Sequence, residues 1–253
     1  MSKVFVLPQG IRIAEDDVLR ELPIAPTTGE AEKVFTRKPN NQTLYTWFGR
    51  LISAAVEEIN GVPVSAPFLK DASKTIPDAV RDISMPDVGS LLLQIQCECW
   101  QDTIENQQIR CTSCGTNLIA DVELRKIPIE VPEEPHPDFV EVSLGTTYKI
   151  QTGLEAFSEW EGLTYDTAVF RVPLLRDALK YEKIAQNEVE FWRKVSMDCL
   201  LHLKNSETGE VISPEYVHRR GALLMNEDWN TVTLKNVCYR LLTGFPTVKF
   251  FYA

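Results

Sequence analysis

The stretch "CECWQDTIENQQIRCTSC", residues 97–114, carries four of the six cysteines in this chain of 253 residues. One residue separates Cys97 from Cys99, and two residues separate Cys111 from Cys114. Two close thiol pairs joined by a short loop are typical of a tetrahedral Zn²⁺ site, in which four thiolates bind the metal at about 2.3 Å. We therefore expect Cys97, Cys99, Cys111 and Cys114 to hold one structural Zn²⁺ ion, with no coordination position left for water or substrate.

The two cysteine pairs make different demands on the backbone. In a C-x-x-C-G turn the sulfurs of Cys111 and Cys114 point at one centre, and Gly115 gives the chain the freedom to leave the turn. Cys97 and Cys99 share a face only in an extended segment, because side chains i and i+2 of a strand point the same way. We therefore expect the helix-like run "SLLLQI" to end before Cys97.

Other ligand sets and occupants fit the same cysteines. Cys99, Cys111 and Cys114 could bind Zn²⁺ together with another ligand, such as His136. Iron, in a rubredoxin-like or iron–sulfur centre, is the alternative metal, since four cysteines do not by themselves exclude it. The thiols could also be plain buried or oxidised side chains. The sequence leaves open zinc against iron, and Cys97 against another residue as the fourth ligand.

Composition and charge narrow the class of protein. Apolar residues make up 44% of the chain and charged residues 25%, which is typical of globular proteins with a substantial core. The net charge of −10 argues against nucleic acid as a partner, because phosphate binding requires clustered Lys and Arg. The start of the chain has no signal-peptide pattern, and no apolar run reaches about 18 residues. We therefore expect synthesis in the cytoplasm, where thiols stay reduced, and no membrane span.

The residue pattern divides the chain into an α+β arrangement of three parts. Residues 1–40 predict an extended N-terminal arm. Residues 41–131 predict a helical segment plus a zinc-ribbon domain over 97–131, so that a small β zinc ribbon is inserted among helices. The stretch "PEEPHPDF", with three prolines in eight residues, is the best linker candidate. Residues 139–253 predict an α+β C-terminal domain with helices and strands.

Two regions show helical periodicity. Within residues 41–61, apolar side chains recur at spacings of three and four, which predicts an amphipathic helix that ends at Gly61. Residues 173–203 predict one long helix or two short ones. Before the first cysteine pair, Asp87 or Ser90 is expected to cap an apolar run that fits either a helix or a strand.

Other regions predict strands. Residues 117–131 alternate between apolar and polar side chains, which indicates strands with a slip near Lys126. Residues 139–152 predict a strand pair that turns at Gly145. Beyond these regions we expect helices over residues 213–225 and 230–244 and a terminal aromatic strand over 245–253.

Motifs of common enzymes are absent from the sequence. It contains no phosphate-binding G-x-x-x-x-G-K-[ST] loop, no G-x-G-x-x-G, no H-E-x-x-H and no G-x-S-x-G. Its three histidines have no neighbouring Cys or Ser that would suggest nucleophilic catalysis. We therefore expect a protein that is not an enzyme and has no small-molecule substrate.

The order of several motifs is informative as a set. An N-terminal "LPQGIRI" leads to a long amphipathic helix, and a leucine-rich run precedes the cysteine pairs. Strands with "VELRKIPIEV" follow, then the proline-rich break and "DFVEVSLGTTYKI". This layout resembles the baseplate and baseplate-hub assembly proteins of contractile-tailed, T-even-like bacteriophages and related contractile injection systems. In many of these a C-x-x-C pair opens a metal-binding ribbon. Cys111 and Cys114 match that pair, whereas the C-x-C spacing of Cys97 and Cys99 departs from it.

The resemblance implies a non-enzymatic structural or assembly subunit whose partners are other protein subunits of a large assembly. It implies location in the host cytoplasm during synthesis and in the virion tail baseplate if the protein stays in the particle. Contacts would be made by residues 1–40, residues 246–253 and the Trp47–Phe48 face. The alternative function is a zinc-ribbon adaptor in transcription or translation. The loop of residues 100–110 carries two acids against one Arg, which disfavours phosphate contact.

Overall fold

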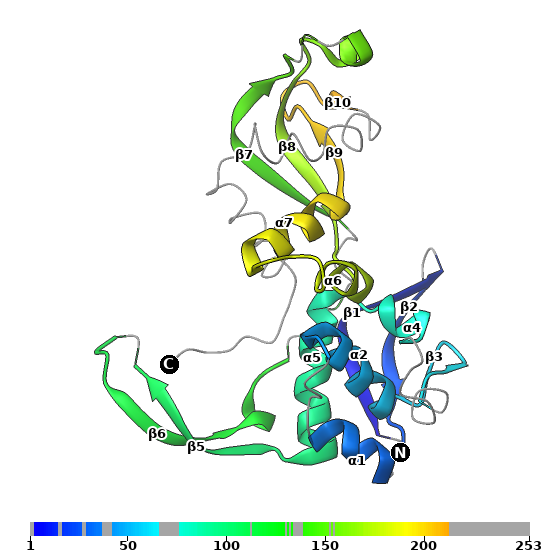
Figure 1. Ribbon diagram of the computed structural model, residues 1–253, viewed down its shortest axis with the longest axis vertical. Helices are drawn as coiled ribbons and strands as arrows, with labels where there is room; N and C mark the ends of the chain where they lie inside the picture. The colour runs from blue at the N-terminus through cyan, green and yellow to red at the C-terminus, as the bar shows by residue number, and fades with distance from the viewer. Residues whose placement is uncertain are drawn as a thin grey trace. The chain divides into compact units, whose positions relative to one another are not determined.

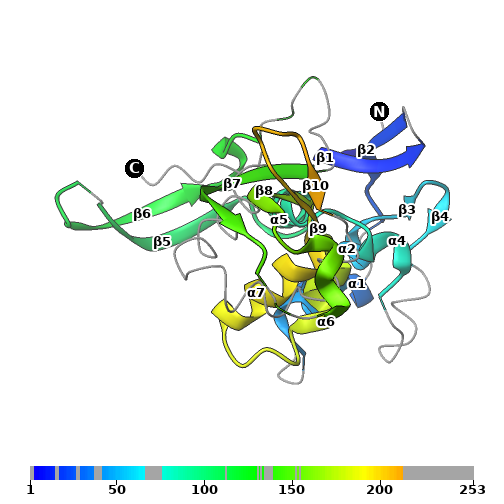
Figure 2. The ribbon, with the colours of Figure 1, turned by 90° about the horizontal axis from the view of Figure 1, so that it is seen from above.

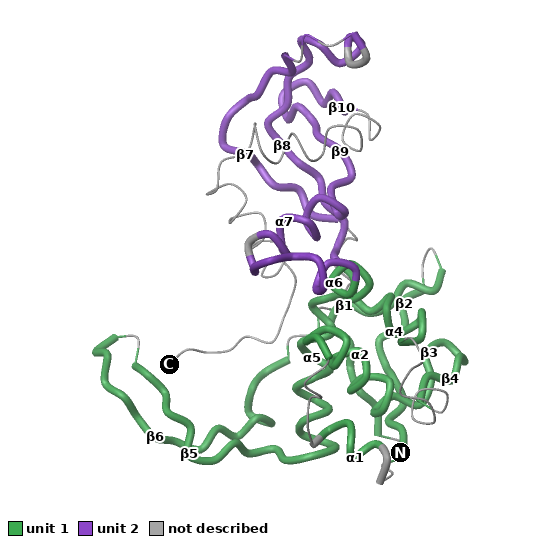
Figure 3. The backbone as a smooth tube through the Cα atoms, viewed as in Figure 1, with its two compact units in different colours: residues 1–136, 174–179, 246–253 green, residues 137–173, 180–245 purple. Residues whose placement is uncertain are grey.

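The computed structural model describes most of residues 3–212. The gaps are residues 15–16, 27–28, 37–41, 66–75, 112, 130, 132, 134–138, 152 and 154. The predicted helices over 213–225 and 230–244, the terminal strand and His136 lie outside the described residues. The described chain forms two compact units (Figure 3). Unit 1 contains residues up to 133 and Leu174–Leu179, and unit 2 contains residues 139–173 and 180–212. Both contain helices and strands, so the α+β prediction is confirmed, although a zinc ribbon is not shown.

The N-terminal part of unit 1 belongs to its hydrophobic core. Strands β1 (Val4–Ala14) and β2 (Asp17–Pro23) pair in antiparallel fashion, and helix α1 (Gly29–Thr36) follows. Phe5 and Leu7 lie two residues apart and therefore share one face of β1, and both are fully buried. The segment expected as an extended arm is thus a hairpin and a helix whose apolar side chains pack within unit 1.

Helix α2 (Leu44–Ala55) confirms the periodicity found in the sequence, but it ends earlier than expected. Strands β3 (Glu58–Ile59) and β4 (Val62–Pro63) form a short hairpin after it. Asn60 and Gly61 have positive φ angles of 50° and 73°. Asn-Gly with two positive φ angles is the preferred two-residue hairpin turn, so Gly61 shapes a turn and does not end the helix.

The Trp47–Phe48 pair, expected to form a contact face, is half-buried in unit 1. Both side chains pack against the buried cluster. The indole Nε1 of Trp47 donates a hydrogen bond to the carbonyl of Val34 at 3.3 Å. This face of α2 therefore serves the core and holds α1 in place.

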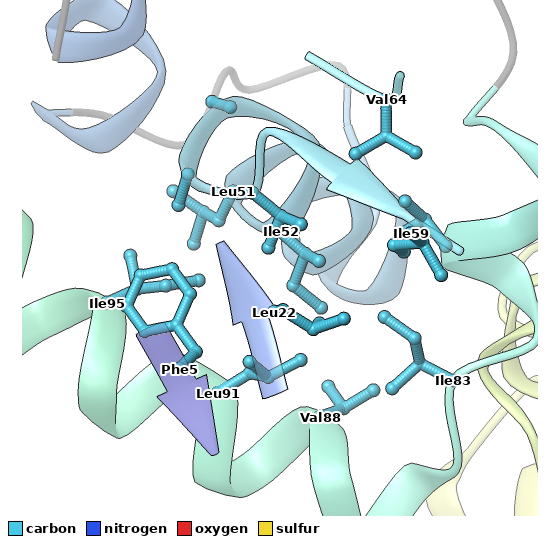
Figure 4. Packing of buried hydrophobic residues seen from close by; sticks show 14 of the residues in the cluster. Phe5, Leu22, Leu51, Ile52, Ile59, Val64, Ile83, Val88, Leu91 and Ile95 are labelled. Carbon is cyan, nitrogen blue, oxygen red and sulfur yellow. The ribbon is translucent and has the colours of Figure 1, made fainter. Parts of the chain in front are cut away.

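Helices α4 (Asp78–Arg81) and α5 (Met85–Ile95) complete the described core of unit 1. The N-cap of α5 is Ser84, not Asp87 or Ser90 as expected, and its Oγ accepts a hydrogen bond from the N–H of Asp87. Three α5 side chains at helical spacing then face β1 and β2 in the buried cluster (Figure 4). These side chains are Val88, Leu91 and Ile95.

The side chains of α5 also bind the backbone of β1. The buried carboxylate of Asp87 accepts the N–H of Gln9 at 2.8 Å, the N–H of Gly10 at 3.1 Å and the hydroxyl of Ser84 at 2.8 Å. About two turns later, the amide of Gln94 accepts the N–H of Val6 and donates to its carbonyl, at 2.8 and 2.7 Å. These contacts satisfy polar groups on the β1 edge and fix the strand to the helix.

Unit 2 is built on a four-stranded antiparallel sheet in the order β10-β9-β8-β7. The strands are β7 (Phe139–Lys149), β8 (Thr164–Arg171), β9 (Leu200–Lys204) and β10 (Val211–Ile212). The predicted turn at Gly145 is wrong, because β7 runs through this residue. Gly145 has a φ of 77° and lies where the pairing with β8 is irregular, which indicates a bulge.

The region expected as one long helix or two short ones contains two. Helix α6 (Leu175–Tyr181) is divided between the units, and helix α7 (Glu188–Cys199) belongs to unit 2. The Asn187 side chain caps α7 by accepting the N–H of Glu190 at 2.9 Å. The chain continues directly into β9, so the predicted helix ends before residue 203.

Candidate functional site

The cysteine-rich stretch contains a long β-hairpin in unit 1. Strands β5 (Thr103–Arg110) and β6 (Asn117–Glu123) pair in antiparallel register, with Arg110 opposite Asn117 at the tip. In both views the hairpin extends away from α5 (Figure 1 and Figure 2). Most of its side chains are exposed. Within the described part of the chain, these two strands form a sheet of their own.

The first cysteine pair lies in a helix. Cys97 and Cys99 belong to a π-helical turn, Gln96–Trp100, which continues α5. The prediction that the helix ends before Cys97 is wrong. The helix continues because Cys99, four residues after Ile95, packs against the buried cluster, and its burial raises the pKa of the thiol. Side chains two residues apart in a helix do not face each other, so Cys97 and Cys99 are not a pair of ligands on one face.

The second cysteine pair forms the tip of the β5–β6 hairpin. The N–H of Cys111 donates to the carbonyl of Thr116, and the N–H of Gly115 donates to the carbonyl of Cys111, each at 2.9 Å. Gly115 has a φ of 73°, which favours glycine at this position of the turn. The Cys114 thiol lies 3.3 Å from the Oγ1 of Thr116 and is exposed. Hydrogen bonds from Thr116 and from Cys111 lower the pKa of Cys114 to about 7.

The hairpin separates the two cysteine pairs. Strand β5 has eight residues, and an extended strand rises about 3.3 Å per residue, so its ends are roughly 25 Å apart. Cys97 and Cys99 precede the base of this strand, whereas Cys111 and Cys114 lie beyond its tip. Among the described residues, no three His, Cys, Asp or Glu side chains are grouped to hold a metal ion. The tip therefore presents two of the four thiols of the expected site, and the β5 strand separates them from Cys97 and Cys99.

An ion-pair network, here called the Arg125 clamp, fixes the base of the hairpin. Arg125 donates to Asp102 through Nε at 2.8 Å, to Glu98 through Nη1 at 2.7 Å and to the carbonyl of Cys97 through Nη2 at 3.1 Å. Lys3 donates to the second oxygen of Glu98 at 2.8 Å. The hydrogen bond from Lys3 and the one from Arg125 lower the pKa of Glu98. The clamp connects the residues on both sides of the hairpin with the end of α5 and the start of β1.

A groove of about 430 Å³ adjoins the clamp. Lys3, Glu98 and Arg125 contribute charged groups to its lining. Its apolar lining includes Phe5 and Ile127. Periodicity in the sequence does not reveal either the groove or the clamp, since Lys3 and Arg125 are far apart in the chain.

Comparison of the chain with protein-family models, with curated proteins and with solved structures gave no match. No described helix has the length and the apolar character that crossing a bilayer requires.

Proposed function

We propose that this protein is a non-enzymatic structural or assembly subunit of a phage-like contractile tail baseplate and that it acts through protein–protein contacts. The observation that carries the proposal is the β5–β6 hairpin, which presents exposed strands outside the core of unit 1. The order of sequence motifs, which resembles baseplate and baseplate-hub assembly proteins, supplies the identity of the assembly.

The hairpin has the properties of a docking element. An isolated two-stranded hairpin is at best marginally stable in water, and its outer edges have unpaired N–H and C=O groups that can accept a further strand. Leu118 and Ile119 are 53% and 75% exposed, and as consecutive strand residues they point to opposite faces. Pairing with a neighbouring subunit would satisfy the edges and remove both apolar side chains from water.

The Arg125 clamp supports this role because it holds the hairpin at its base. A docking element that is fixed at one end loses less conformational freedom when it binds than a free segment does. The clamp joins residues from both ends of the hairpin to α5, so the strands leave unit 1 in a defined direction. We therefore assign the contact surface to the outer part of the hairpin, residues 104–122.

The charge of the hairpin disfavours the adaptor function in transcription or translation. The acidic side chains of Glu105, Asp121 and Glu123 face a single basic one, Arg110, within the two strands. A surface that contacts phosphates requires the opposite balance. Protein subunits are therefore the better-supported partners.

The test is assembly with candidate subunits, using proteins encoded beside this chain's gene as partners. The double variant Leu118→Ser/Ile119→Ser removes the exposed apolar side chains of the hairpin. Its matched control is Ile184→Ser/Val211→Ser, since these two residues of unit 2 are 60% and 53% exposed. We expect co-elution in size-exclusion chromatography for the wild type and the control and its loss for the hairpin variant. Unchanged co-elution of the hairpin variant, or no partner for the wild type, would contradict the proposal.

A further inference from the structure

The hairpin tip presents two thiols, which is half of the coordination shell that a tetrahedral thiolate-bound metal requires. We propose that Cys111 and Cys114 of two copies of this chain bind one Zn²⁺ ion between two hairpin tips. This inference deepens the proposed function, because it names a second copy of the chain as one partner of the hairpin.

The turn at the tip already brings the two thiols together. Its backbone is closed by the hydrogen bonds between Cys111 and Thr116 and between Gly115 and Cys111. Because this turn spans only Cys111 to Thr116, both thiols lie at the same end of the hairpin without any rearrangement of the strands. Cys114 is exposed and Cys111 half-buried, and a metal ion can therefore reach both from outside the hairpin.

Among the residues that the structure describes, the remaining two ligands are not found beside the tip. Cys97 and Cys99 lie at the far end of β5, roughly 25 Å away by strand rise. Around the tip, the described part of the chain places no third Cys, His, Asp or Glu within a metal-binding group. Since the described residues supply only two ligands at the tip, we assign the other two to a second molecule.

A second copy of the same tip supplies the two missing thiolates and can be related to the first by a twofold axis. Two identical turns related by a twofold axis supply four thiolates, and closed twofold contacts are the commonest form of self-association. Four thiolates around Zn²⁺ leave two formal negative charges. The guanidinium of Arg110 supplies one positive charge in each copy. It lies beside the turn, because its Nη2 is 3.8 Å from the position that a Cβ atom would occupy at Gly115. The exposed Leu118 and Ile119 follow the tip directly and would gain contacts across the axis.

In the proposed dimer the metal, not surface area, holds the two tips together. The turn is small and its flanking strands are narrow, so the contact lies far below the area of a stable metal-free interface. Coordination of structural zinc by thiolates supplies a large binding free energy. Association should therefore depend strictly on the metal.

Size-exclusion chromatography with light scattering tests this proposal on the full chain. The measurements use a phosphine reductant, so that disulfide-linked dimers do not form, and compare added Zn²⁺ with added EDTA. The variant Cys111→Ser/Cys114→Ser removes the proposed ligands, and Cys97→Ser/Cys99→Ala is the matched control. We expect zinc to double the measured mass of the wild type and the control, with one zinc ion per two chains by elemental analysis. The tip variant should remain monomeric, with an unchanged thermal unfolding midpoint.

Several results would overturn the zinc bridge. A monomer whose zinc is lost in both double variants would mean that one chain closes a four-cysteine site. Zinc bound by a monomer through the tip alone, a dimer that persists in EDTA, or no zinc binding would each contradict it as well. If one of these occurs while Leu118→Ser/Ile119→Ser still abolishes binding to neighbouring subunits, the bridge is wrong and the proposed function stands.

Discussion

At the scale of single residues, Asp87 is a carboxylate that is completely buried. Its side chain is fully buried between α5 and β1 and accepts three hydrogen bonds. Burial nevertheless outweighs these hydrogen bonds and the nearby charge of Arg20, and it raises the pKa of the carboxyl group to about 6. At neutral pH the folded protein therefore holds an ionised carboxylate in a place that favours the protonated form.

Acidification should increase the contribution of Asp87 to stability. An unfolded Asp has a pKa of 3.8, so between about pH 6 and this value the folded state binds the proton more tightly than the unfolded state. This stabilising contribution is absent above the pKa of Asp87 in the folded state. It is complete below the pKa of Asp87 in the unfolded state. The gap of roughly two pKa units corresponds to about 3 kcal/mol. Urea unfolding of the wild type and of Asp87→Asn, which does not titrate, measures the difference from about pH 7 to about pH 4.

The comparison with Asp87→Asn is needed because other carboxyl groups act in the opposite direction. Hydrogen bonds lower the pKa values of Asp166 and Glu190, so these groups lose stabilising contacts as the pH falls. The free energy of unfolding of the wild type relative to Asp87→Asn should rise toward acid. A difference that is constant or that shrinks would show that Asp87 is ionised in the folded state throughout this range.

At the residue scale, a sequence motif predicts local backbone structure better than it predicts what surrounds each side chain in the fold. The C-x-x-C-G pattern correctly indicates a tight turn from Cys111 to Gly115. Cys99 is different, because cysteine can either pack as a small apolar side chain or bind a metal, and the residue type alone does not distinguish the two roles. Tertiary packing of α5 decides between these roles, and one sequence does not contain that information.

The element that matters most is the β5–β6 hairpin, and the Arg125 clamp controls its attachment. Arg125→Ala removes three hydrogen bonds at the base of the hairpin. We expect faster amide hydrogen exchange along both strands, because the base opens more often, and an unchanged unfolding midpoint for the core of unit 1. Lys126→Ala is the control, since it removes only the exposed ion pair with Glu123. Equal exchange rates in the two variants would show that Arg125 does not stabilise the base of the hairpin.

Helices and strands with strong local patterns could be predicted, and their ends could not. The apolar stripe identifies α2, but its end depends on the Asn60-Gly61 turn and on the strands that this turn joins. A single strand through Gly145 and two strands joined by a turn there have the same local pattern, since glycine permits both. Pairing with β8 along both halves of β7 makes the strand continuous.

On the scale of the whole molecule, the division into units follows contacts that are distant in sequence. The boundary between unit 1 and unit 2 falls between residues 136 and 137, within the proline-rich stretch. The return of Leu174–Leu179 to unit 1 has no local signal. It depends on the fully buried Leu175, whose N–H donates to the carbonyl of Ile83 at 2.9 Å. This contact forms only when the rest of unit 1 is folded, so the composition and periodicity of the sequence do not predict it.

The most direct test of the hairpin as a protein-contact element is amide hydrogen exchange of the full chain, alone and in the purified assembly. We expect the amides of residues 104–122 to exchange rapidly in the free chain, because the outer edges of the two strands are exposed to water. In the assembly, pairing and burial should slow exchange along these strands more than in β7–β10 of unit 2. Equal exchange of residues 104–122 in the free and assembled protein would contradict the account.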